Sequence, residues 1–212
     1  MNTKIIIFDF DGTLADTRQA IVKTQQQTMR ELQLPVPTEQ ESMATIGLTL
    51  KNCFRALCPT LTNEQVDACA TTYQRLFNEN KKLYPPVLFP HVRETLKALK
   101  QQGLTLTIAS SRTSASLHEL TQELGISDYI SYIVGGDDVE KPKPEAEPVL
   151  VTLRALGFRP DEALVVGDMP VDILMGRNAG ARTCAVTYGN ATPQQLDDAR
   201  PDSIIDDMQK LL

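Results

Sequence analysis

The feature that most constrains the fold is the alternation of short apolar segments with helical patterns through the second half of the chain. The apolar segments span 104–109, 129–134, 163–166 and 182–187, with a possible edge segment at 203–205. Helical patterns lie between them at 92–103, 117–124, 148–156, 170–179 and 193–198, and the first four end at or next to a glycine. Strands that alternate with helices of about 10–15 residues predict a parallel, doubly wound α/β sheet.

One expected strand stands apart from the others. Residues 4–8 have the continuous apolar character of a buried strand, and about 70 residues with helix signals but no clear strand follow it. Thr38-Glu39-Gln40-Glu41 matches a capping box, and Tyr84-Pro85-Pro86 forms a stiff joint. We therefore expect a Rossmann-like α/β core of residues 1–14 and 85–212, with a helical cap of residues 15–84 inserted after the first strand. Such an insertion lies at the carboxyl edge of the sheet, where open α/β sheets bind ligands.

Composition excludes several classes of function. The 212 residues carry a formal net charge of −6 and contain no basic block, so nucleic acid is not an expected partner. No apolar run is long enough to span a membrane or to form a signal peptide. Cys53, Cys58, Cys69 and Cys184 match no zinc spacing and are expected to be buried, reduced thiols. We expect a cytoplasmic monomer or weak dimer without a membrane partner.

The first motif with chemical content is Asp9-Phe10-Asp11-Gly12-Thr13, which follows the first strand directly. Residues two apart in an extended chain share a face, so the two carboxylates are expected side by side. Like charges in such a place repel unless a cation joins them, and a divalent cation does so most simply. The alternative is a strand that runs into an ordinary Asp-Gly turn.

A second pair of acids follows the strand expected at 163–166. Asp168 comes at its end, and Asp172 lies one helical turn further. Alone, they would be an N-cap and a favourable acid in the first helical turn. The carboxyl ends of parallel strands meet at one edge, however, so these acids are expected close to Asp9 and Asp11. Hard oxygen ligands of this kind suit Mg²⁺, which also binds substrate phosphates.

Two further polar residues complete the expected site. Ser110 comes at the end of the strand 104–109, and Lys141 begins the segment Lys141-Pro142-Lys143-Pro144. Prolines on both sides of Lys143 stiffen this loop, so that it can aim a lysine at a fixed point. A hydroxyl and an ammonium suit phosphate oxygens. Only its place relative to the prolines favours Lys141 over Lys143, and the alternatives are a capping serine and a solvated loop lysine.

In this order, the motifs resemble those of the haloacid dehalogenase-like phosphotransferases. The resemblance covers essentially the whole chain, and the expected cap resembles the small helical cap of that family. Leu14-Ala15-Asp16-Thr17 and Ile46-Gly47-Leu48 most resemble the corresponding segments of phosphoglycolate phosphatases and their close relatives.

The resemblance implies a Mg²⁺-dependent phosphatase that acts on a small phosphorylated metabolite, with 2-phosphoglycolate as the best single substrate. It implies that Asp9 is the nucleophile and forms an aspartyl-phosphate, while Asp11 is the general acid and then the base. Further implied roles are Mg²⁺ binding by Asp9, the backbone carbonyl of Asp11 and Asp168; phosphate binding by Ser110 and Lys141; and support by Asp172, Gly12 and Thr13. Asp172 would hold a metal-bound water or orient Lys141.

Two residues of this chain differ from those of particular members of the family, and they narrow the choice of reaction. Dehalogenase members lack an acid at the place of Asp11, so Asp11 favours phosphoryl transfer over halide displacement. Mutase-like relatives carry a histidine where this chain has Ile21, which favours hydrolysis. The alternatives are an inorganic pyrophosphatase, a sugar-phosphate phosphatase or a β-phosphoglucomutase-like mutase. A more distant alternative is a non-catalytic phosphate-sensing module.

The cap is expected to carry substrate specificity. Polar residues near the Gly47 turn are candidates to face the substrate, and a solvated helix surface is an equally good interpretation of them. The candidates are Arg18, Thr45, Lys51, Thr49 and Asn52.

Overall fold

The computed structural model describes residues 3–212 and contains two compact units. One unit comprises residues 3–15 together with Leu88–Leu212, and the other comprises Asp16–Val87. The boundaries expected from the sequence fall after residue 14 and before residue 85. Two very short strands, β2 (Ala15–Asp16) and β3 (Val87–Leu88), pair with each other where the chain passes between the units.

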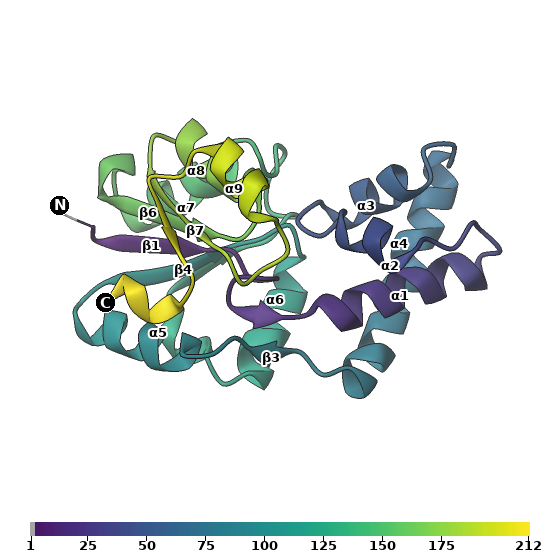
Figure 1. Cartoon of the computed structure of the whole chain (residues 1–212), viewed down its shortest axis with the longest axis horizontal. Helices are drawn as coiled ribbons and strands as arrows, with labels where there is room; N and C mark the ends of the chain where they lie inside the picture. The colour runs from purple at the N-terminus through teal and green to yellow at the C-terminus, as the bar shows by residue number, and fades with distance from the viewer. Residues whose placement is uncertain (1–2) are drawn as a thin grey trace. The chain divides into compact units, whose positions relative to one another are not determined.

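The first unit is built on a six-stranded parallel sheet, which confirms the predicted α/β class. The strand order is β5-β4-β1-β6-β7-β8, and Figure 1 shows β1 running alongside β4 in this sheet. The strands span β1 Ile5–Phe8, β4 Thr105–Ala109, β5 Tyr132–Val134, β6 Ala163–Gly167, β7 Arg182–Val186 and β8 Ser203–Ile205. Ile5 pairs with Thr105 on one side and with Ala163 on the other. Motifs that follow β1 and β6 therefore leave the sheet next to each other.

Helices cover both faces of this sheet (Figure 1), as a doubly wound fold requires. They are α5 (Val92–Gln101), α6 (Ser114–Glu123), α7 (Glu147–Leu156), α8 (Pro170–Asn178) and α9 (Pro193–Ala199), with short 3₁₀ turns η1 (Ser127–Tyr129), η2 (Pro160–Glu162) and η3 (Met208–Leu211). Ile5 and Val165 of the sheet pack with Val149 of α7 and Met175 of α8 in one buried cluster. This apolar core fixes the strand ends that carry the polar motifs.

The second unit is helical, as the sequence predicts. It contains α1 (Arg18–Glu31), α2 (Glu39–Met43), α3 (Leu50–Leu57) and α4 (Asn63–Leu83). Thr38 forms the predicted capping box with Glu41 at the start of α2. Helices α1 and α4 pack against each other, and Phe54 of α3 meets Tyr73 of α4 edge to face.

Two further observations bear on the class of protein. None of the helices within residues 3–212 has the length and apolar character needed to cross a membrane. All four cysteines are free thiols, and Cys58 alone among them is not fully buried.

Candidate active site

Three carboxylates from two neighbouring strand ends meet at the carboxyl edge of the sheet. Asp9 follows β1, Asp168 follows β6, and Asp172 lies in the first turn of α8. Carboxylate oxygens from these three side chains lie within 4.8 Å of one another, and all three side chains are buried. The structure thus brings Asp9 together with Asp168, as the parallel strand order leads one to expect.

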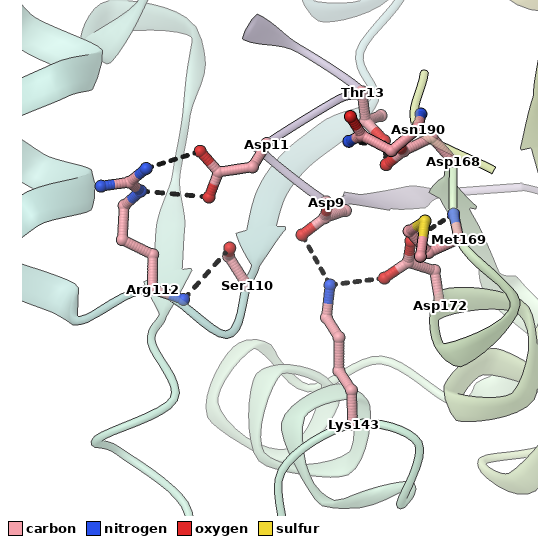
Figure 2. A network of polar contacts seen from close by, with 10 residues as sticks. All are labelled: Asp9, Asp11, Thr13, Ser110, Arg112, Lys143, Asp168, Met169, Asp172 and Asn190. Carbon is pink, nitrogen blue, oxygen red and sulfur yellow. Dashed lines mark hydrogen bonds and ion pairs between the residues drawn. The ribbon is translucent and has the colours of Figure 1, made fainter. Parts of the chain in front are cut away.

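A buried lysine lies between two of these acids, and it is Lys143 rather than Lys141 (Figure 2). Lys143 Nζ donates to Asp9 Oδ1 and to Asp172 Oδ1, each at 2.6 Å. Lys141 is exposed, and its backbone N–H donates to Glu147 at the start of α7. The choice of Lys141 is therefore corrected. Lys143 is the residue that has a proline on each side, and the argument from loop stiffness applies to it.

Asp168 is held by donors from two different loops. The Thr13 hydroxyl donates to Asp168 Oδ1 at 3.0 Å. The backbone N–H and the side-chain amide of Asn190 donate to Oδ2 at 2.7 and 2.9 Å. These bonds fix the orientation of the carboxylate and satisfy part of its hydrogen-bonding capacity, as outer partners of metal ligands commonly do.

Glycine is required beside Asp168 at Gly12 and Gly189. Gly12 has a φ of +92°, which side chains other than glycine rarely adopt. A Cβ on either glycine would lie 2.2 Å from a side-chain atom of Asp168. Gly12 and Thr13, the two residues expected from the sequence to support the site, both lie against Asp168.

The segment Tyr188-Gly189-Asn190 after β7 was not expected in the site. Asn190 binds Asp168, and the Tyr188 hydroxyl donates to the Thr13 carbonyl at 2.9 Å. The available signal in the sequence was a polar residue after a glycine, just beyond the end of the strand predicted at 182–187. Strand ends on one edge of a parallel sheet deliver such residues to a common place.

The Asp11 carboxylate points away from the three-carboxylate group and toward Arg112 (Figure 2). Arg112 donates from Nη2 to Asp11 Oδ1 at 2.7 Å and from Nε to Oδ2 at 3.1 Å. The same residue donates its backbone N–H to the Ser110 hydroxyl oxygen at 3.4 Å. Sequence reasoning assigned no role to Arg112, because the pairing joins residues 101 positions apart.

Burial shapes the electrostatics of the acidic group. Burial raises the pKa of Asp9 to about 7. The positive charge of Lys143 acts in the opposite direction, whereas the neighbouring carboxylates of Asp172 and Asp11 add to the increase. Burial raises the pKa of Asp168 well above its ordinary value, and the nearby Asp172 and Asp9 carboxylates raise it further. Burial disfavours the charged form of Lys143, but Asp172 and Asp9 outweigh it and leave the lysine pKa raised. The negative charge of the ionised carboxylates is therefore not fully compensated by Lys143, and a divalent cation bound to their oxygens would compensate it.

The candidate specificity residues of the cap have different environments. Thr45 is buried within the cap; its hydroxyl accepts from Gln25 Nε2 at 3.0 Å and donates to the Ser42 carbonyl at 2.8 Å. Its expected role toward substrate is therefore corrected to an internal structural one. Lys51 forms an exposed ion pair with Asp67, and Arg18 donates its backbone N–H to Asp16. Thr49 is the N-cap residue of α3, and Asn52 is exposed.

Two relatives match the sequence of this chain over nearly their whole length. A protein of Dickeya dadantii named "Probable phosphatase IndB" is 36% identical over 210 residues, which cover 98% of this chain and 91% of that protein. Pyrophosphatase PpaX of Oceanobacillus iheyensis is 32% identical over 212 residues, which cover 100% of this chain and 96% of that protein.

A solved structure extends the likeness to three dimensions. The crystal structure of a predicted phosphoglycolate phosphatase from Haemophilus somnus superimposes with a TM-score of 0.91 at 27% identity. The match covers 100% of this chain and 97% of that one. The model of the family described as "Haloacid dehalogenase-like hydrolase" matches residues 6–186, which include all the acidic motifs. The chain therefore belongs to the haloacid dehalogenase-like hydrolases.

Proposed function

We propose that the protein is a Mg²⁺-dependent phosphatase that hydrolyses a small phosphomonoester, with 2-phosphoglycolate as the best single substrate. The observation that carries the proposal is the buried group of Asp9, Asp168 and Asp172 with Lys143 between two of its members. An oxygen nucleophile beside a fixed cation and a set of hard oxygen donors matches the needs of phosphoryl transfer. The family membership and the phosphatase names of relatives support it.

In the first half of the reaction, Asp9 attacks the phosphorus of the substrate in line with the leaving oxygen. A bond forms from the Asp9 carboxylate to phosphorus, and the bond from phosphorus to the leaving oxygen breaks. Asp11 donates a proton to that oxygen, so the leaving group departs as an alcohol. In the second half, Asp11 takes a proton from water, which attacks the phosphorus and releases Asp9 and inorganic phosphate.

Each remaining residue holds the reacting groups in place. Lys143 and Ser110 bind oxygens of the transferred phosphoryl group, with Lys143 in the role first expected of Lys141. Asp172 positions Lys143 through the 2.6 Å bond between them. Thr13 and Asn190 hold the Asp168 carboxylate.

The described residues fit a magnesium ion, because buried carboxylates with raised pKa values converge there. Asp9, the backbone carbonyl of Asp11 and Asp168 would hold the ion. When bound, Mg²⁺ offsets the repulsion between an anionic nucleophile and an anionic phosphate.

A second candidate function is the hydrolysis of pyrophosphate. One relative that covers the whole chain is named a pyrophosphatase, and the residues above serve that reaction equally well. Ile21, a buried residue of α1, cannot transfer protons, and this favours both hydrolytic functions over a mutase.

The test is the release of inorganic phosphate by the purified protein, with MgCl₂ and with EDTA. The substrates are 2-phosphoglycolate, pyrophosphate, glucose 6-phosphate and β-glucose 1-phosphate. We expect turnover only with Mg²⁺, highest kcat/KM on 2-phosphoglycolate, and loss of turnover in Asp9→Asn but not in the exposed control Asp198→Asn. Absence of Mg²⁺-dependent phosphate release from every substrate would refute the proposal, and a stable Asp9 phosphate without turnover would favour a sensor.

We also propose that the protein is located in the cytoplasm and that it is a monomer or a weak dimer.

A further inference from the structure

Arg112 lies within the α/β unit and is bound to the residue that the proposed function makes the proton donor. Its guanidinium holds both carboxylate oxygens of Asp11 in a bidentate arrangement, and Nη1 also donates to Ser116 at 3.2 Å. Both charged side chains are largely buried, with 9% of Arg112 and 13% of Asp11 exposed. Figure 2 shows this pair beside Ser110, on the far side of Asp9 from Asp168.

The pair cannot persist unchanged through the reaction. To protonate the leaving oxygen, a carboxyl oxygen of Asp11 must come within hydrogen-bond reach of it. In this structure, both Asp11 oxygens accept from Arg112. The Asp11 carboxylate also points away from the three-carboxylate group (Figure 2), so Asp11 must turn and give up at least part of this pairing. Removing a carboxylate from a buried guanidinium is costly, because the charge loses its compensation in a medium of low dielectric constant.

A substrate with a second anionic group can compensate the charge of Arg112 when Asp11 turns away from it. The Arg112 guanidinium already binds the Asp11 carboxylate through two parallel hydrogen bonds. Phosphate oxygens suit the same pair of donors. Because Arg112 contacts the proton donor, it lies toward the leaving-group end of the substrate. In 2-phosphoglycolate, the carboxylate carbon is two bonds from the leaving oxygen, and in pyrophosphate the second phosphorus is bonded to it directly.

We propose, on the basis of the proposed function, that Arg112 is a specificity-determining residue that binds a second anionic group of the substrate in exchange for Asp11. The exchange frees Asp11 to face the leaving oxygen. A phosphomonoester with a neutral leaving group provides no replacement anion, so Asp11 stays paired with Arg112 for longer. The substrate class is therefore small phosphate esters or anhydrides whose leaving group carries a carboxylate or phosphate.

The test compares two substrates that differ in one charge. Kinetics are measured with 2-phosphoglycolate and with phosphoglycolamide, in which a neutral carboxamide replaces the carboxylate; pyrophosphate is the phosphate-bearing arm. Because hydrogen bonds to charged groups are stronger than those between neutral groups, we expect wild-type kcat/KM to favour 2-phosphoglycolate by roughly 10- to 100-fold. We expect Arg112→Met to bring this ratio to within a few-fold of one and to lower kcat/KM for pyrophosphate in parallel.

Two further variants complete the design. Arg112→Lys keeps the positive charge but cannot donate two parallel hydrogen bonds, so we expect a kcat/KM ratio between those of wild type and Arg112→Met. This variant also tests the proposal if Arg112→Met folds poorly. Arg159→Met makes the same substitution as Arg112→Met at an exposed arginine of the α/β unit and should leave the ratio unchanged.

The outcomes separate the two proposals. A loss that is equal for all substrates in Arg112→Met would show that the residue only positions Asp11, and would overturn the specificity role. A wild-type ratio near one would overturn it too. If no phosphate ester or anhydride is turned over, the proposed function itself fails.

Discussion

Replacing Asp9, the proposed nucleophile, should stabilise the metal-free protein, and the gain in unfolding free energy should depend on pH. Asp9 has a pKa of about 7 in the folded protein against an ordinary value of 3.8. Between these values, the folded state binds more protons than the unfolded state, so the Asp9 contribution to stability falls as pH rises from about 4 to 7. Above pH 7 the penalty reaches about 4 kcal/mol, from roughly 1.36 kcal/mol per pKa unit.

Asp9→Asn removes this charge and keeps a side-chain oxygen that can still accept from Lys143. The chain contains no tryptophan, so urea unfolding in EDTA is followed by circular dichroism, at pH 5 and pH 8. We expect Asp9→Asn to exceed wild type in unfolding free energy by up to about 4 kcal/mol at pH 8 and by less at pH 5. Asp198→Asn, in an exposed position, is the control. An equal difference at both pH values, or a less stable Asp9→Asn at pH 8, would refute the reasoning.

Three further predictions test other parts of the site. Lys143→Met should lower kcat by at least roughly 100-fold, because it removes a fixed cation from the phosphoryl group, whereas Lys141→Met should stay close to wild type in the phosphate-release assay. Asn190→Ala should weaken Mg²⁺ binding by roughly 10- to 100-fold in calorimetric titrations, and unchanged affinity would show that its bonds to Asp168 do not matter for the metal. Gly12→Ala should lower the unfolding free energy by roughly 1–3 kcal/mol in urea, since its Cβ would collide with Asp168 at a positive φ; a neutral effect would contradict the close approach.

The parts of the site that the sequence predicts are those fixed by strand order. Asp9 and Asp168 each follow an apolar strand, and parallel strands place such residues at one edge whatever the loops do. Gly12 and Thr13 belong to the same short motif and come with it. The alternation of strands and helices was enough to predict the sheet, because its central apolar segments, in β1, β4, β6 and β7, are largely buried on both faces.

Residues whose role depends on the direction of one side chain were harder to predict. Lys141 and Lys143 share a loop, and packing against Asp9 and Asp172 decides which of them turns inward. Arg112 pairs with Asp11 across a long sequence separation, and no local pattern encodes that contact. Thr45 is polar, as surface residues commonly are, but its side chain is buried and hydrogen-bonded to Gln25 of α1 and Ser42 of α2.

The central position of β1 also has a consequence for how the protein is made. Ile5 is synthesised well before its two neighbours in the sheet, Thr105 and Ala163. Until then, the run Ile5-Ile6-Ile7-Phe8 is an apolar, β-prone segment with both edges unpaired, a state that favours aggregation. The contiguous helical unit of Asp16–Val87, by contrast, has all of its own residues available before β4 is translated. Nascent chains that stall before β6 would therefore expose this apolar segment, and holdase chaperones should bind them at Ile5-Ile6-Ile7-Phe8.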